Sequence, residues 1–104
     1  MKIDLFCHIL PPAYFERMTA VSTRGAYMQK RVRGIPAMVD LDERFRMMDL
    51  FDDYVQVLSL AAPPIEALGS PSQTPELATL ANDTMRRPWP GIRTGFPASS
   101  PRCR

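Results

Sequence analysis

The chain has 104 residues, enough for one small domain, and 45% of them are hydrophobic, as is ordinary for a globular protein. It has no run of about 18 apolar residues and no small-residue cleavage site near its start, so neither a membrane-spanning helix nor a signal peptide is expected. The net charge of +2 is divided unevenly between residues 1–85, which are net acidic, and residues 86–104, which are basic. Its only cysteines, Cys7 and Cys103, are too few for a disulfide framework and favour a cytoplasmic protein.

Residues 3–10 predict the first strand, because they are apolar on both sides of the alternation and two prolines follow. His8, the only histidine of the chain, lies near the C-terminal end of this strand. Histidine is the commonest metal ligand and the usual proton carrier near neutral pH. A single histidine without partners can equally be a core residue, and both interpretations stay open.

Residues 12–18 predict a short helix that begins at Pro12 and packs its apolar side chains on the first strand. Residues 19–34 have no clear apolar period and predict a solvated loop. Residues 34–39 predict an extended segment that Pro36 limits to a sheet edge. A basic cluster with a neighbouring aromatic residue in the loop is a weak sign of phosphate or nucleic-acid binding; it comprises Tyr27, Met28, Lys30, Arg31 and Arg33.

Asp40 is a good N-cap for a second helix that we expect to continue to about residue 53. On this helix, Arg44 or Arg46 can form a salt bridge, contact a substrate carboxylate, or lie on a solvated face. Residues 54–60 are short, apolar and rich in β-branched side chains, and so predict a buried parallel strand.

Ser59 lies near the C-terminal end of the second strand, but no base stands near it in the sequence, so it carries no sign of a nucleophile. Residues 75–86 predict a last helix, with apolar side chains at helical spacing. We expect this helix and that of residues 41–53 to pack on one face of a parallel strand pair. The fold class predicted is therefore α/β, with a β-α-β unit.

Several stretches are similar to the amidohydrolase superfamily, in the branch of aminocarboxymuconate-semialdehyde decarboxylase. That branch typically opens with Ile-Asp-x-His-x-His and a proline shortly after, and Ile3, Asp4, His8 and Pro11 match it. Three later stretches also resemble the family, in the same order: an Arg-x-x-x-Met-Asp run that begins at Arg44, the Val-Gln-Val-Leu-Ser of residues 55–59, and the Leu-Ala-Asn-Asp of residues 80–83.

The resemblance implies that residues 1–85 are the N-terminal β-α-β portion of a truncated TIM (β/α)₈ barrel, a fold of about 250 residues. It implies metal-dependent hydrolysis or decarboxylation of a small carboxylated substrate, with a divalent metal, usually zinc, and with His8 as one ligand. Phe6 stands where the paired histidine belongs. Cys7 points to the opposite face, whereas Asp4 is expected on the face of Phe6, one pleat lower.

Since zinc needs about three protein ligands, we expect this chain alone to be inactive. The unpaired edges of its sheet also predict that the isolated chain aggregates. Whether it forms a defined oligomer stays an open question at this point.

Residues 86–104 differ in composition from the rest. They carry five Arg and no acid, whereas residues 1–85 carry eight Lys or Arg and eleven Asp or Glu. We expect a disordered tail. One hypothesis is a shifted reading frame, because a one-base shift from residue 92 onward permits the family-like Pro-Asp-Arg-Phe-Pro-Gly-Phe-Val-Ala-Ser-Leu-Pro. The alternative function is a small interaction protein whose basic tail binds nucleic acid or acidic surfaces.

Overall fold

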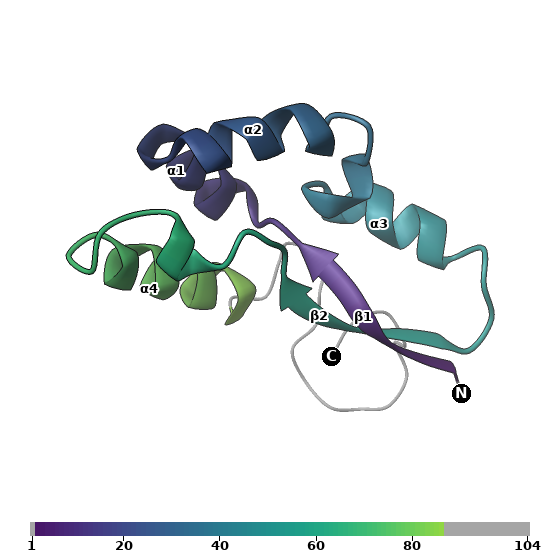
Figure 1. Ribbon diagram of the computed structural model, residues 1–104. Coiled ribbons are helices and arrows are strands. Elements are labelled where there is room, and N and C mark those ends of the chain that lie inside the picture. The colour runs from purple at the N-terminus through teal and green to yellow at the C-terminus, as the bar shows by residue number, and fades with distance from the viewer. Residues whose placement is uncertain (1, 87–104) are drawn as a thin grey trace.

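The computed structural model describes residues 2–86. They form a mixed α/β structure with four α-helices and a two-stranded parallel sheet (Figure 1). In chain order, the elements are β1 (Lys2–Ile9), α1 (Pro12–Val21), α2 (Thr23–Val32), the 3₁₀ helix η1 (Pro36–Met38), α3 (Leu41–Met48), β2 (Tyr54–Leu60), the 3₁₀ helix η2 (Ile65–Ala67) and α4 (Thr74–Arg86).

The two strands pair in parallel, as the sequence predicted, with Ile3 opposite Val55 and His8 opposite Ser59. The register shifts between Asp4 and Cys7, so β1 has a bulge in its middle. Such a bulge changes which face the following side chains occupy. Strict alternation along β1 therefore fails between its two halves.

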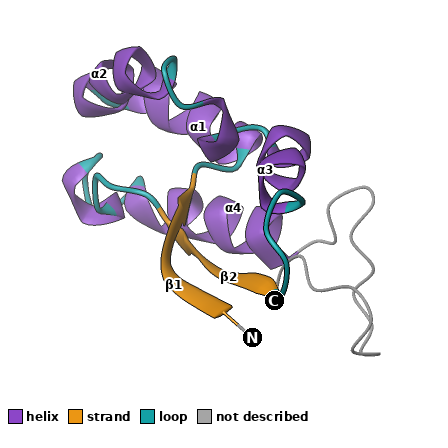
Figure 2. Cartoon of the chain, turned by 90° about the vertical axis from the view of Figure 1, so that its right-hand side faces the viewer, coloured by secondary structure: helices purple, strands orange, loops and turns teal. Residues whose placement is uncertain are grey.

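Figures 1 and 2 show α3 lying along one side of the strand pair, and none of the described helices covers the opposite side. Parallel strands normally have both faces covered. Here four large apolar side chains of the strands remain exposed; they are Ile3, Leu5, Phe6 and Val57.

The main hydrophobic core lies beyond the C-terminal ends of the strands. It joins α1, α2 and α4 to the residues that follow each strand, and it comprises Leu10, Tyr14, Met18, Val32, Ala61, Leu68, Leu77 and Ala81. Helix α4 packs against α1 and η2. The expected packing of two helices on one sheet face is therefore met by α3 but not by α4, because Leu77 and Ala81 are buried in this core.

Residues 23–32 form helix α2, so the predicted loop is wrong. Ser22 caps the helix, and its Oγ accepts a hydrogen bond from the backbone N–H of Arg24. The buried face consists of Gly25 and Val32, with Met28 packed partly against the core. A glycine adds nothing to an apolar period, which explains why the sequence pattern concealed this helix.

Two further expectations are corrected. Residues 36–38 are a 3₁₀ helix and not an extended segment, and the carbonyl of Pro36 accepts hydrogen bonds from the N–H groups of Val39 and Asp40. Helix α3 ends at Met48 and not near residue 53. The chain must turn there to enter β2, and Asp53 adopts a left-handed backbone conformation, with φ of 55°, that aspartate tolerates.

Candidate functional site at the strand ends

The structure brings His8 and Ser59 together, each one residue before the end of its strand. Nδ1 of His8 lies 2.8 Å from Oγ of Ser59. Oγ of Ser59 also lies 3.2 Å from the carbonyl oxygen of Cys7, to which it donates. The imidazole that the sequence did not place near Ser59 thus comes from the neighbouring strand.

Either partner of the His8–Ser59 contact could be the donor, and the second contact of Ser59 favours one of the two tautomers. A serine hydroxyl has a single hydrogen, and the carbonyl of Cys7 can only accept one. When Ser59 donates to that carbonyl, Nδ1 of His8 carries the proton and donates it to Ser59. The lone pair of the imidazole lies on Nε2, which is the atom free to accept a proton or bind a metal.

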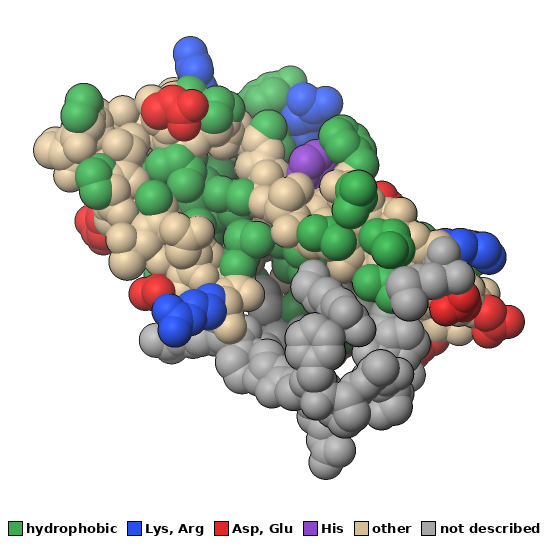
Figure 3. All heavy atoms as spheres, turned by 90° about the horizontal axis from the view of Figure 1, so that it is seen from below, with side chains coloured by type: hydrophobic (Ala, Val, Ile, Leu, Met, Phe, Trp, Pro, Cys, Tyr) green, Lys and Arg blue, Asp and Glu red, His purple; other side chains and the backbone are tan. Residues whose placement is uncertain are grey.

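In this tautomer, Ser59 orients the imidazole and is not an activated nucleophile. Activation requires that a base take the hydroxyl proton, whereas here the hydroxyl donates to a main-chain carbonyl. Figure 3 shows the imidazole of His8, coloured purple, at the surface with hydrophobic side chains around it. The ring of His8 is half-buried, so its contact with Ser59 orients it while part of it stays accessible to solvent.

Phe6 and His8 share one side of β1, as expected. Their ring centroids are 4.6 Å apart, with an interplanar angle of 70°, so that the edge of one ring faces the other. Phe6 itself is 82% exposed. The position that would hold a second imidazole is therefore beside His8 and open, but its phenyl ring has no ligand atom.

Cys7 is buried on the other side of the strand, as expected, and its thiol donates to the carbonyl of Asp4. The expectation for Asp4 is wrong. Its carboxylate accepts a 2.6 Å hydrogen bond from the hydroxyl of Tyr54, on the side covered by α3. The bulge between Asp4 and Cys7 places Asp4 there, away from His8.

Arg44 lies at the centre of the polar contacts under α3, and it is only 7% exposed. Its guanidinium donates to three acceptors: the carbonyl of Ala37 at 2.9 Å, Oε1 of Gln56 at 2.7 Å and the carbonyl of His8 at 2.5 Å. Arg44 is thus neither on a solvated face nor available to a substrate. It fixes α3 and η1 to the backbone that carries His8.

The network continues from Gln56 to Asp4. Nε2 of Gln56 donates to the hydroxyl of Tyr54 at 3.1 Å, and Asp4 in turn accepts from the N–H of Phe6 at 3.0 Å. The hydrogen bond from Tyr54 is the main cause that lowers the pKa of Asp4, and the same bond raises the pKa of Tyr54. The charged carboxylate of Asp4 thereby stabilises the bulge, because it accepts hydrogen bonds from the N–H of Phe6 and from the hydroxyl of Tyr54.

Arg46, in contrast, is exposed and forms an ion pair with Glu43, with nitrogen–oxygen distances of 2.6 and 2.8 Å. This is the salt bridge that was one of the expectations for the pair Arg44 and Arg46. The basic tail, on which the nucleic-acid alternative depends, lies outside the described residues apart from Arg86.

Within residues 2–86, no three His, Cys, Asp or Glu side chains come together as a metal site would require. His8 has the right atom available, but its neighbours do not fit zinc. The chain matches no known protein family, no curated protein and no solved structure. The resemblance therefore remains a prediction. None of the described helices is long and apolar enough to cross a membrane.

A comparison of the two strand ends would have found the His8–Ser59 contact, since each residue is one step before the end of a predicted parallel strand. Arg44 gave no comparable signal. Its burial depends on the acceptors of Ala37 and His8, which are main-chain atoms.

Proposed function

We propose that residues 1–85 form the first β-α-β portion of an amidohydrolase-like barrel that hydrolyses or decarboxylates a small carboxylated substrate in a metal-dependent reaction. The observation that carries the proposal is the position of His8 and Ser59. They lie at the C-terminal ends of two parallel strands, where (β/α)₈ enzymes gather their catalytic groups.

The exposed side of the sheet supports the same proposal. Gln56 points toward α3, where it contacts Arg44, so Ser59, three residues further along β2, points to the other side together with His8 and Phe6. Side chains directed to the interior of a barrel would lie on that side. Further strands beside β1 and β2 would bury Phe6 and Val57, which are 82% and 41% exposed here.

The described residues do not complete a zinc site, so no step of the reaction is assigned to them through a metal. Their part in the proposal is to orient His8. Ser59 fixes the tautomer with the Nε2 lone pair available, and Arg44 holds the carbonyl of the same residue. In this proposal the remaining ligands and the acid or base come from additional strands, and we expect the chain of 104 residues to be inactive without them.

Sequencing the DNA that encodes the chain is the first test. A one-base insertion or deletion near codons 85–88 should restore an open frame that encodes further strand–helix units with histidine and aspartate at strand ends. If no such frame exists, the barrel proposal loses its missing strands and is wrong.

The restored-frame protein provides the functional test. Its Phe6→His variant should release product from small carboxylated substrates in the presence of zinc, and adding His8→Ala should abolish this activity. The matched control is Arg46→Ala, which should leave the rate unchanged. Arg46 is exposed, and its hydrogen bonds go to Glu43 and not to residues at the strand ends. Activity that persists without His8 would overturn the proposal.

A further inference from the structure

A groove separate from the strand ends lies between α2 and the turn that follows β2. It is open to solvent and has a volume of about 420 Å³. One wall is a single face of α2, formed by Arg24, Tyr27, Met28 and Arg31, and the other is formed by Ala62 and Pro63.

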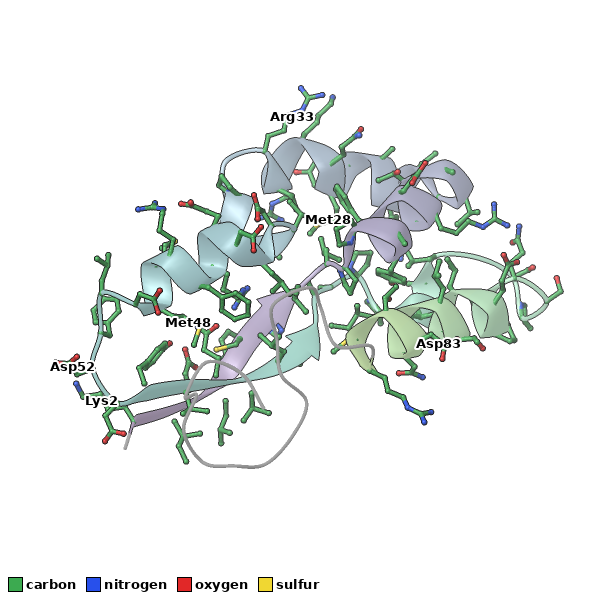
Figure 4. The ribbon with its side chains drawn as sticks, turned by 180° about the vertical axis from the view of Figure 1, so that it is seen from behind. Lys2, Met28, Arg33, Met48, Asp52 and Asp83 are labelled. Atoms are coloured by element: carbon green, nitrogen blue, oxygen red, sulfur yellow. The ribbon has the colours of Figure 1, made fainter. Side chains whose placement is uncertain are left out.

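The spacing of these residues explains the groove. Positions i, i+3, i+4 and i+7 of a helix lie on one face, so the two arginines stand at the ends of a stripe with the aromatic ring between them. Seven residues of helix span about 10 Å. Figure 4 shows Met28 on the inner side of α2 and Arg33 at its outer end. Met28 packs partly against the core and so supports the groove from below.

Both arginines are exposed, and neither guanidinium forms an ion pair or a hydrogen bond with another residue of the described part of the chain. Arg17 and Arg46 differ, because each pairs with a glutamate, whereas Arg33, which follows α2, forms no such pair with a described residue. Helix α2 itself contains no acidic residue. The two guanidinium groups flanking the groove therefore retain their full capacity to bind an anion.

We propose that this groove binds a small organic phosphate that carries a planar ring, of the size of a mononucleotide. Guanidinium groups bind phosphate oxygens through paired N–H donors and also stack on flat rings. Tyr27 is 61% exposed and offers its ring as a stacking surface between the two arginines. The apolar side chains of Met28 and Pro63 favour a ligand with an uncharged, flat body over a bare anion.

The groove favours one nucleotide over a nucleic-acid strand. Among residues 2–86, one aromatic side chain lines it, whereas single-strand binding sites stack successive bases on several rings along a continuous basic path. The proposal concerns the groove between α2 and the turn after β2, and it is independent of the function proposed for the strand ends.

The test is calorimetric titration of the full chain with adenosine 5′-monophosphate at low salt. We expect saturable binding that weakens about tenfold or more in Arg24→Gln and in Arg31→Gln, since each removes a charge-assisted contact. Tyr27→Leu should weaken binding of the nucleotide about fivefold or more through lost stacking, and leave the weaker binding of inorganic phosphate unchanged.

The matched control is Arg33→Gln, which removes the same charge from the residue that follows α2, outside the groove, and should change the affinity less than about twofold. Circular dichroism of each variant confirms that α2 is intact. Three results would overturn the proposal: no binding of the nucleotide at millimolar concentration, equal affinity for inorganic phosphate, or equal weakening by Arg33→Gln. Much tighter binding of a single-stranded oligonucleotide would replace it with a nucleic-acid site.

Discussion

Nδ1 of His8 lies 2.8 Å from Oγ of Ser59, so a side-chain hydrogen bond joins the two parallel strands beside their C-terminal ends. If Ser59 donates its own hydrogen to the carbonyl of Cys7, the contact selects the tautomer of His8 with a protonated Nδ1. This relationship links the fold to the only residue of the described chain with an obvious chemical role.

The tautomer can be measured directly. We expect ¹⁵N NMR of the wild type in mildly alkaline buffer to show a protonated Nδ1 and an unprotonated Nε2 for His8. In Ser59→Ala, the acceptor is lost and the preference for a protonated Nδ1 should decrease or reverse. A wild-type spectrum with the proton on Nε2 would show that the hydrogen bond runs in the opposite direction.

The close approach of α1 and α2 depends on Gly25. A Cβ at this position would clash with the carbonyl oxygen of Met18 and lie 2.7 Å from its carbonyl carbon, both of them backbone atoms. We expect Gly25→Ala to lower the free energy of unfolding by about 1–3 kcal/mol, although alanine favours a helix. Urea denaturation measures this.

Gly34→Ala is the matched control, since the nearest atom to its new Cβ, the carbonyl oxygen of Arg31, is 3.9 Å away. This variant should be neutral or slightly stabilising. Equal effects of the two substitutions would contradict the packing of the two helices.

Burial of Arg44 makes a strong prediction for α3. Arg44→Met leaves the carbonyls of Ala37 and His8 without their donor, so the free energy of unfolding should fall by about 2–4 kcal/mol. Arg44→Lys should not restore it, because an ammonium cannot reach three separated acceptors as the guanidinium does. Arg46→Met, on the exposed side of the same helix, should cost less than about 1 kcal/mol. A small effect at Arg44 would mean that the network contributes little.

Asp4 predicts a specific sensitivity to acid. The hydrogen bond from Tyr54 is the main cause that holds its pKa below the usual 3.8, so the charged carboxylate stabilises the fold above that value. This contribution is lost as the pH falls through the folded-state pKa. The stability advantage of the wild type over Asp4→Asn should therefore shrink as the pH is lowered from about 5 to about 2.

Tyr54→Phe tests the cause. Without the phenol, the pKa of Asp4 should rise toward its usual value, and the acid dependence of the difference should become smaller. Comparing variants also removes the contribution of Glu43, whose pKa the hydrogen bond from Arg46 lowers in the same way. An unchanged acid profile in Tyr54→Phe would contradict the assignment.

The strands were predictable because both are short and mostly apolar on both sides of their alternation, and their parallel pairing followed from the helical segments between them. Helix α2 was not, since its buried face includes Gly25, which an apolar period does not register. The bulge between Asp4 and Cys7 was equally hidden, because it depends on how the two strands align. It moved Asp4 to the side of Tyr54. At the site, Phe6 and His8 were placed correctly by alternation, whereas the burial of Arg44 depended on main-chain acceptors that no side-chain pattern reveals.

The account rests on His8 being the single ligand-type side chain of an incomplete metal site, with Phe6 in place of its partner. Calorimetric titration with zinc at neutral pH tests this most directly, in the wild type, His8→Ala, Phe6→His and the double variant. We predict that the wild type binds zinc no better than His8→Ala, and that Phe6→His gains weak binding that the double variant loses, because two imidazoles still leave zinc short of a protein ligand. Tight, stoichiometric binding by the wild type that disappears in His8→Ala would contradict the account.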